Sequence, residues 1–440
     1  MSRSQAATTA DASPGLGGSR RAVAVVIGVV FLDLLGFGII IPILPFYVRS
    51  FAISDVFIGL LAASYSLAQF VAAPYLGRIS DERGRRPVLM LSVGAAGVAW
   101  LVFGFAAEVG DLAGTTAAVV TLFAARLLAG AAGGNIAAAQ AYIADVTPRE
   151  SRASALGLVG AAFGLGFVFG PAIGGLMASD GVVAFARDVL PGFIPATRFS
   201  LPSFTAAALS FAALAAAAVV LKEPDRKRGP ARRVTFVTQF REALADAAIR
   251  PLVLSFFLTS FAFAGVQVMF IPFLADFFGY DATGAALFLT YIGVLGTINQ
   301  GIVVGRLARR FGPRRVVLAG VGSLFSALVV LAVSPTLAGL VPPLGGPAWL
   351  TGGVVVLLGF ATLASFGNGA LTVGLATLVS ERASADAQGS AFGVTQGAGS
   401  LGRTVGPPLA AAAYVAVAWS PFAAGALVLL PVVVLLWRAQ

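Results

Sequence analysis

Long apolar stretches separated by short polar segments recur from one end of the chain to the other. They fall near residues 22–48, 56–76, 87–107, 115–144, 153–178, 200–221, 251–275, 283–304, 314–334, 348–378, 389–415 and 418–437. An α-helix needs about 20 mostly apolar residues to cross the hydrocarbon core of a bilayer. The stretches must be helical, because an open strand in lipid would leave its backbone groups without hydrogen-bond partners. The pattern predicts an all-α membrane protein with about twelve transmembrane helices.

Composition supports a membrane protein and weakens an enzymatic function. Apolar residues make up 58% of the 440 residues and charged residues 11%, a balance that could not solvate the surface of a soluble domain. The 53 glycines suit helices that approach one another closely in lipid. The chain has no cysteine and no histidine, so it lacks thiol nucleophiles, imidazole bases and the metal ligands of both types. We therefore expect no enzyme activity, no metal and no cofactor.

Basic residues are distributed unevenly between the two predicted sides of the membrane. If the N-terminus is cytoplasmic, the same side holds the basic run within 222–250 together with Arg78, Arg83, Arg85, Arg86, Arg149, Arg152, Arg306, Arg309, Arg310, Arg314, Arg315, Arg382 and Arg438. The opposite side holds Arg49, Arg187 and Arg198. This asymmetry follows the positive-inside rule and predicts a multi-pass protein of the cell (inner) membrane with both termini cytoplasmic. The net charge of +10 then reports orientation in the lipid bilayer, and binding to nucleic acid is the poorer interpretation.

A charge-rich segment divides the chain into two halves that resemble each other. The predicted parts are a cytoplasmic tail at 1–21, an N-terminal six-helix bundle at 22–221, a cytoplasmic linker at 222–250 and a C-terminal six-helix bundle at 251–440. The segment GRISDERGRRPV at 77–88 recurs as GRLARRFGPRRV at 305–316. Both copies start with the same orientation, so the pattern predicts two parallel-related bundles with a binding site between them near the bilayer midplane.

Four stretches carry a resemblance to a known family. They are Leu32-Asp33…Gly36…Gly38…Pro42…Pro45, the segment from Gly77 to Pro87, the segment from Arg126 to Pro148, and Gly166…Gly170-Pro171…Gly174-Gly175. On these motifs the chain resembles the major facilitator superfamily, and more narrowly its twelve-helix drug:proton antiporters, which include the tetracycline exporters. The resemblance implies a proton-coupled exporter of small amphipathic organic molecules or drugs. Such a protein would work by alternating access, as a functional monomer driven by the proton gradient.

An acid, Asp33, lies near the middle of the first predicted helix, and Arg126 lies on the fourth. Ionisable groups at membrane depth are costly and are functional hypotheses by default. The resemblance assigns both residues to proton coupling, with the arginine close to the acid. Structural roles stay open: Asp33 as the partner of a helix dipole or an arginine, and Arg126 packed against carbonyl groups. For Arg403, a second intramembrane arginine, bracing of the eleventh helix is the favoured role.

The connection between the second and third predicted helices holds a candidate gate. Its residues are Gly77, Asp81, Gly84, Arg85 and Arg86. The glycines are expected to allow tight turns, and Asp81 can accept hydrogen bonds at the start of a helix. The resemblance implies a latch on the cytoplasmic side, with the start of the eleventh helix near Gln388 and Gly389 as the partner of Asp81. A loop that serves topology alone is the alternative, and the second copy has Arg309 in place of Asp81.

Glycines recur every four residues on the fifth predicted helix, at Gly166, Gly170 and Gly174, next to Pro171. This spacing places the three glycines on one face, where a neighbouring helix can pack against bare backbone. The proline leaves a carbonyl group free and bends the helix. The resemblance identifies this face as an antiporter motif that seals the transport pathway, and plain helix packing would give the same pattern.

Candidate pocket residues are aromatic or uncharged polar residues at membrane depth. They are Phe37, Gln140, Phe263, Gln267, Phe270, Asn368 and Gln396. Such a lining suits an amphipathic or cationic organic molecule, although aromatic residues in membrane helices serve packing more often than binding. The tetracycline exporters also carry an acid and a histidine in the second half. The absence of both at matching places here argues against tetracycline itself as the substrate.

Two other classes of function stay open at this point. A symporter or facilitator for a sugar, an amino acid or a nucleoside would use the same fold. A membrane-embedded enzyme or a non-transporting sensor is more remote. The chain lacks the usual catalytic residue types, and no segment reads as a soluble signalling domain.

Overall fold

The computed structural model describes residues 16–224, 240–241, 244–247, 249–342, 347, 349–383 and 388–438. The N-terminal half contains α1 (Leu16–Ile40), α2 (Leu44–Ser50), α3 (Val56–Arg83), α4 (Arg85–Gly104), α5 (Ala106–Ala113), α6 (Thr115–Ala132), the 3₁₀ turn η1 (Gly133–Asn135), α7 (Ile136–Val146), α8 (Arg149–Met177), α9 (Asp180–Val189) and α10 (Ser200–Val220). The C-terminal half contains α12 (Arg250–Phe278), α13 (Ala282–Ile298), the π-helical turn η2 (Asn299–Val303), α14 (Val304–Phe311), α15 (Pro313–Ala332), α16 (Ser334–Leu340), α17 (Gly352–Arg382), α18 (Gln388–Ala416) and α19 (Ser420–Arg438). The predicted tail up to residue 15 and much of the predicted linker, from 225 to 239, lie outside the described residues.

The long helices have the length and composition of transmembrane spans. Among the described residues, eleven helical segments are long and apolar enough to cross a membrane. Two of them are composite: α6, η1 and α7 form Thr115–Val146, and α13, η2 and α14 form Ala282–Phe311. The twelfth long helix is α18, which is richer in small and polar residues and packs against α12 and α3. The predicted all-α membrane fold with about twelve transmembrane helices is confirmed.

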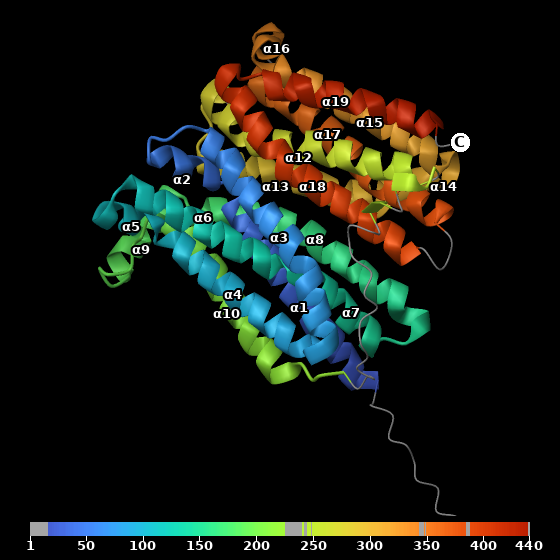
Figure 1. Cartoon of the computed structure of the whole chain (residues 1–440). Coiled ribbons are helices and arrows are strands. Elements are labelled where there is room, and N and C mark those ends of the chain that lie inside the picture. The colour runs from blue at the N-terminus through green and yellow to red at the C-terminus, as the bar shows by residue number, and fades with distance from the viewer. Residues whose placement is uncertain are drawn as a thin grey trace, which may run out of the picture.

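The spans alternate in direction, so the connections gather at two ends of the molecule (Figure 1). The short helices α2, α5, α9 and α16 lie at one end, here called the far end. At the other end, here called the termini end, α1 begins and α19 ends. The two six-helix halves lie side by side, and α3 packs on α18 while α8 packs on α13. These two contacts are the seams between the halves.

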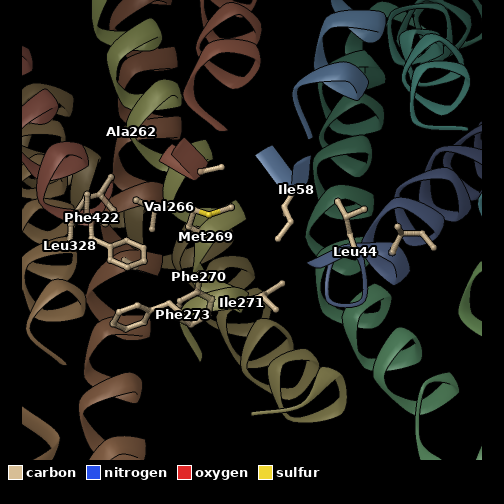
Figure 2. Close-up of a cluster of buried hydrophobic side chains, with 14 of the residues drawn as sticks. Leu44, Ile58, Ala262, Val266, Met269, Phe270, Ile271, Phe273, Leu328 and Phe422 are labelled. Carbon is tan, nitrogen blue, oxygen red and sulfur yellow. The ribbon is translucent and has the colours of Figure 1, made fainter. Parts of the chain in front are cut away.

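One apolar cluster continues across the junction of the halves near the far end. Leu44 and Ile58 of the N-terminal half belong to the same buried cluster as Met269, Ile271 and Phe273 of α12 (Figure 2). In lipid, close packing of this kind is what holds helices together, because the surrounding hydrocarbon is equally apolar. The far-end part of the junction is therefore a packed core rather than a lining of a wet cavity.

The predicted loop between the second and third spans is mostly helical. α3 continues through Arg83, so Gly77 lies within a helix and the expectation that it forms a tight turn is wrong. The break comes at Gly84, whose φ of +119° favours glycine. The second half repeats this arrangement, since α14 runs through Phe311 and Gly312 has a φ of +84°. Helical hydrogen bonding continues past the apolar span until a glycine ends it.

Candidate functional site

The glycine face of α8 packs directly against α1, the helix that carries Asp33. A Cβ atom placed on Gly170 would lie 2.6 Å from the Cα atom of Gly38, and one placed on Gly166 would lie 2.9 Å from the Cβ atom of Leu34. A Cβ atom on Gly174 would meet the backbone carbonyl group of Ile39. The predicted packing against bare backbone is therefore present, and it holds α1 by its main chain.

The carboxyl group of Asp33 has no fixed polar partner. Its side chain is half-buried, and within the described residues it forms no hydrogen bond and no ion pair. It lies one turn before Phe37, whose ring contacts the rings of Tyr65 on α3 (centroids 4.8 Å apart) and Phe167 on α8 (6.2 Å apart). An acid in this position can exchange a proton without first breaking an ion pair.

Arg126 of α6 is buried, with 4% of its surface exposed. Its guanidinium carbon lies 4.6 Å from the ring centroid of Tyr65 and 5.7 Å from that of Phe37. Its Nε–H group donates a long hydrogen bond of 3.4 Å to the backbone carbonyl of Leu61. Cation–π contacts thus replace the ion pair that a buried arginine usually needs. Arg126 reaches the helix of Asp33 through Phe37, and none of the described contacts joins it to the carboxyl group itself.

Tyr65 is the residue around which the ionisable groups of the spans meet. The charges of Asp33 on α1, Arg126 on α6 and Arg403 on α18 all act on its hydroxyl group. Arg403 comes from the C-terminal half and donates from Nη2 to the Ser400 hydroxyl at 2.8 Å. Tyr65 was not among the residues predicted from the sequence. Tyr65 could have been found from its position one helical turn before Gln69, a polar residue at membrane depth. In the structure the amide of Gln69 donates to the Gly133 carbonyl at 3.0 Å.

The other candidate pocket residues do not form one set. Phe270 is buried in the apolar cluster of Figure 2, with its ring centroid 5.1 Å from that of Phe360 on α17. Phe263, Gln267 and Asn368 are half-buried, and Gln140 and Gln396 are exposed. Of the predicted pocket residues, Phe37 is the one that the structure brings into contact with the ionisable residues.

At the termini end, a charge network surrounds the start of α4. Arg85 pairs with Asp81 at 2.7 Å and with Asp145 of α7 at 3.1 Å. The carboxylate of Glu223 accepts hydrogen bonds from the backbone N–H groups of Arg85 (2.8 Å) and Arg86 (2.9 Å). A carboxylate at this place also stabilises the positive end of the helix dipole. All these residues belong to the N-terminal half or directly follow its last helix.

The predicted latch differs from the structure at Glu223 and reaches outside the described side chains at residues 388 and 389. Glu223, which caps α4, lies at the start of the predicted linker and was not among the candidate residues. It lies so close that a Cβ atom on Gly84 would be 2.7 Å from its carboxylate, and the φ of +119° at Gly84 is what makes the turn favour glycine. The side chains of Gln388 and Gly389, the predicted partners of Asp81, lie outside the described residues.

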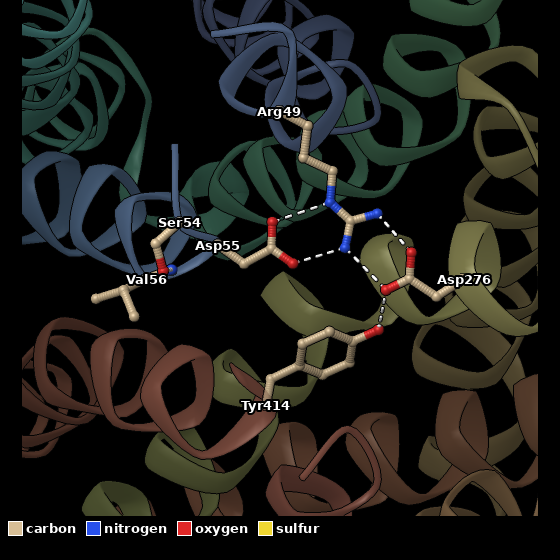
Figure 3. A network of polar contacts seen from close by, with 6 residues as sticks. All are labelled: Arg49, Ser54, Asp55, Val56, Asp276 and Tyr414. Atoms are coloured by element: carbon tan, nitrogen blue, oxygen red, sulfur yellow. Dashed lines mark hydrogen bonds and ion pairs between the residues drawn. The ribbon is translucent and has the colours of Figure 1, made fainter. Parts of the chain in front are cut away.

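At the far end, an ionic network joins the two halves (Figure 3). Arg49, at the end of α2, binds Asp55, just before α3, and also Asp276 of α12, with shortest distances of 2.6 and 2.7 Å. The hydroxyl group of Tyr414 on α18 donates to Asp276 at 2.7 Å. The hydrogen bonds with Asp55 and then with Asp276 raise the pKa of Arg49 above its ordinary value, against the effect of burial. Sequence reasoning missed this network, because its members are up to 365 positions apart along the chain.

The seam between α8 and α13 is closed toward the far end and open toward the termini end. Cβ atoms placed on Gly175 and Gly164 would lie 2.5 Å from Ala286 and 3.0 Å from Thr297, respectively. Gly160 and Gly157 lie on the same face, one and two turns closer to the termini end. Cβ atoms placed there meet nothing within 4 Å in the described structure.

The seam between α3 and α18 has the same shape. A Cβ atom on Gly59 would lie 2.5 Å from the Pro407 carbonyl oxygen and 2.7 Å from the Ala411 side chain. Gly77 lies on the same face of α3 five turns later, and Gly393 lies on the same face of α18 as Ala411. Cβ atoms on both would meet nothing within 4 Å among the described residues. The halves therefore touch from the far end to about the middle and separate toward the termini end.

Comparisons with known proteins agree with this architecture. The model of the Major Facilitator Superfamily matches residues 26–361. Tetracycline resistance protein, class C, from Escherichia coli is 31% identical over 426 residues, which cover 94% of this chain and 96% of that protein. Multidrug resistance protein 1 from Bacillus subtilis is 28% identical over 283 residues, or 64% of this chain and 66% of that protein. A solved bacterial homologue of the human lysosomal transporter Spinster, inward-facing and occupied, shares the fold, with a TM-score of 0.70, 17% identity and coverage of 95% and 94% of the two chains.

Proposed function

We propose, because the chain belongs to the Major Facilitator Superfamily, that it is a proton-coupled exporter of small amphipathic organic molecules that works by alternating access. The names of its relatives, a tetracycline resistance protein and a multidrug resistance protein, support drug-like compounds as substrates. The fold by itself would serve uptake as well as export, so the proposal depends on the site between the halves.

The observation that carries the proposal is the unpaired carboxyl group of Asp33 beside the cluster of Phe37, Tyr65 and Arg126. Protonation of a single carboxyl group changes the charge of this site by one unit. An amphipathic substrate that enters the same space then meets a different electrostatic field in each protonation state. Binding of a proton and binding of a substrate are thereby coupled, which is what exchange requires.

Arg126 has a supporting role in this proposal. Its guanidinium adds positive charge to the cluster that adjoins the helix of Asp33, and positive charge near an acid favours release of the proton. The aromatic rings of Phe37 and Tyr65 hold the arginine in place through cation–π contacts of 5.7 and 4.6 Å. The same rings offer apolar surface to a substrate. Tetracycline itself is not proposed, because α15 carries no acid and the chain has no histidine.

The orientation of the chain completes the proposal. The arginine distribution supports a cytoplasmic termini end in the cell membrane. With that orientation, a molecule closed at the far end and open at the termini end is in an inward-facing state. It would accept its substrate from the cytoplasm, and separation of the seams at the far end would release the substrate outside.

Transport in proteoliposomes tests the role of Asp33. We expect Asp33→Asn to lose proton movement coupled to efflux by more than tenfold, because an amide keeps the shape of the side chain but does not titrate. The assay follows a pH-sensitive dye inside the vesicles while ethidium or rhodamine 6G is exchanged across the membrane. Asp111→Asn, which alters an exposed acid on α5, is the matched control.

Three outcomes would speak against parts of the proposal. If the Asp33→Asn variant still moves protons when substrate is added, Asp33 is not the coupling group. If protons move in the same direction as the substrate, the protein is a symporter. If exchange is unchanged by a pH gradient in the parent chain, the protein is a facilitator.

A further inference from the structure

We propose that Arg49, Asp55, Asp276 and Tyr414 form a far-end gate in which Arg49 binds both halves when the gate is closed and Asp55 alone when it is open. The inference rests on the proposed function in one respect, namely that the two halves separate at the far end during transport. It adds functional residues at a place that none of the sequence motifs covers. Figure 3 shows the four side chains converging from α2, the start of α3, α12 and α18.

The guanidinium group of Arg49 is shared between two carboxylates. On one side, Nε and Nη2 donate to the two oxygens of Asp55 at 2.9 and 2.6 Å. On the other side, Nη1 and Nη2 donate to the two oxygens of Asp276 at 2.7 and 2.9 Å. Asp55 belongs to the same half as Arg49, and Asp276 belongs to the other. Only the two hydrogen bonds from Arg49 to Asp276 have to break when the halves separate.

Each charged group keeps a partner after separation. Arg49 would retain its two-point contact with Asp55, and Asp276 would retain the hydroxyl group of Tyr414 at 2.7 Å. Opening therefore leaves no charged group of the network without a hydrogen bond. Breaking an ion pair is costly mainly when it leaves a charge without a partner. The network can therefore open and close reversibly at a low cost in free energy.

The two carboxylates have opposite effects on the gate. In the closed state one positive charge faces two negative charges, so Asp55 and Asp276 repel each other across Arg49. Asp276 holds the gate closed, because it attracts Arg49 in the closed state alone. Asp55 favours the open state, because it attracts Arg49 in both states but is repelled by Asp276 in the closed one. If the network only stabilised the fold, loss of either acid would act in the same direction.

Apolar packing lies beside this polar fork. Leu44 and Ile58 share a buried cluster with Met269 and Ile271 (Figure 2), and Gly59 of α3 packs on Pro407. The three charged residues are partly exposed, with Arg49 at 28%, Asp55 at 15% and Asp276 at 39% of the side-chain surface, whereas Tyr414 is buried. Water thus screens the ion pairs and keeps their effect modest. Apolar packing between the halves therefore largely determines the equilibrium between the open and closed states, and the ion pairs of Arg49 adjust it.

The test measures the distance between spin labels on the two halves at the far end. The chain has no native cysteine, so Leu112→Cys on α5 and Leu340→Cys on α16, both exposed, can be labelled without a background signal. Double electron–electron resonance in lipid nanodiscs, without substrate or a pH gradient, then gives the ratio of open to closed molecules. Failure of the transport proposal would leave this measurement intact, so the two proposals can fail separately.

We expect Asp276→Asn to raise the open-to-closed ratio about fivefold and Asp55→Asn to lower it about two- to threefold. Where the parent chain populates one distance only, Ile58→Ala, which trims the apolar seam, provides a background with both. Asp180→Asn is the matched control, since Asp180 pairs with Arg198 at the same end but within one half. Shifts in the same direction for both acids, or none beyond the control, would overturn the proposal.

A charge exchange covers the case in which Asp276→Asn does not fold. Arg49→Asp combined with Asp276→Arg places both acids of the network on the N-terminal half and its cation on the other half, so separation leaves the new arginine without its ionic partners. We expect this double variant to keep the closed distance and to reduce the open fraction below that of the parent. An open fraction equal to or above the parent value would contradict a gate that works through these charges.

Discussion

At the far end, the ion pair between Arg49 and Asp276 crosses from one half to the other, whereas at the termini end the ion pairs of Arg85 stay within the N-terminal half. The difference corresponds to the shape of the seams. Where the halves touch, charges link them. Where the halves are apart, Arg85 and its partners Asp81 and Asp145 fasten α3, α4 and α7 to one another. Charges at the two ends thus have different tasks in the same state of the molecule.

The difference between the two ends also explains why glycine recurs along both seams. At the closed parts, Gly59 and Gly175 let backbones approach within contact distance. At the open parts, Gly77 and Gly160 lie on the same helix faces, and in the part of the chain that the structure describes no atom lies within 4 Å of a Cβ atom placed on either. Small residues without a neighbour have no packing use in this state. They are suited to a state in which the termini end is closed instead.

The largest effect is expected from a matched pair of substitutions on α3, Gly59→Leu and Gly77→Leu. Leucine at position 59 would collide with the Pro407 carbonyl and prevent closure of the far end. Overpacking typically costs about 1–3 kcal/mol, a roughly 5- to 150-fold change in population. A side chain at position 77 meets no described atom within 4 Å of its Cβ atom, so this state should persist while closure of the termini end, and with it turnover, is lost.

Spin-label distances at both ends, together with exchange in proteoliposomes, check the pair. Opposite shifts of the two variants, each with lost transport, are expected. If Gly77→Leu transports normally, the termini end does not close on this face, and the difference between the seams has no role in the cycle.

Local patterns in the sequence were sufficient for most of the fold. Hydropathy gave the spans, and the repeat of 77–88 at 305–316 pointed to two halves, which the glycine turns at Gly84 and Gly312 now match. The four-residue spacing on α8 predicted a packing face, and α1 occupies it. These features depend on residues within a few turns of one another, so the linear order of the chain contains them.

The residues that were missed depend on contacts between distant parts of the chain. Arg49 and Asp276 are ordinary charged residues at the ends of spans, and Tyr65 is one aromatic residue among many. Their contacts in the folded structure distinguish them. Arg49 pairs with two acids, and the ring of Tyr65 makes a cation–π contact with Arg126. The misplaced turn at Gly77 has a different cause. Helical hydrogen bonds continue beyond the apolar span, and hydropathy does not register where they stop.

A smaller effect, on stability alone, is expected from Glu223→Gln. The carboxylate caps α4 through two backbone N–H groups, and the amide would retain part of the hydrogen bonding but lose the interaction with the helix dipole. We expect a loss of about 0.5–1 kcal/mol in the free energy of unfolding, measured by denaturation in detergent. The distances at the far end should be unchanged. A shift in those distances would show that the termini-end charges also control the gate, against the contrast drawn above.

Asp81→Asn tests whether the termini end forms a latch when it closes. Asp81 pairs with Arg85 in this state at 2.7 Å, and the proposed partner in the other state is the start of α18. We expect the substitution to favour the present state about two- to fivefold, in line with about 0.3–1 kcal/mol for a carboxylate at a helix start. Labelling rates of single cysteines introduced on the facing surfaces of α3 and α18 near the termini end report this shift. Equal rates for the parent and the variant would leave the segment with a topological role alone.

The smallest effect is expected from Tyr414→Phe at the far end. The hydroxyl group of Tyr414 donates to Asp276 at 2.7 Å, and both residues belong to the C-terminal half. The bond therefore exists whether the gate is open or closed, but Asp276 depends on it more in the open state, where Arg49 has left. Loss of the hydroxyl group should lower the open-to-closed ratio by about twofold or less, because a partly exposed carboxylate is readily hydrated. The direction matches that of Asp55→Asn and opposes that of Asp276→Asn.

In the Asp276→Asn background, Tyr414→Phe should have little further effect, because the carboxylate that accepts the hydrogen bond from Tyr414 is already absent. A shift of Tyr414→Phe toward the open state would mean that the hydroxyl group helps to hold Asp276 against Arg49, and the far-end network would then be a single clamp rather than a gate with partners on both sides.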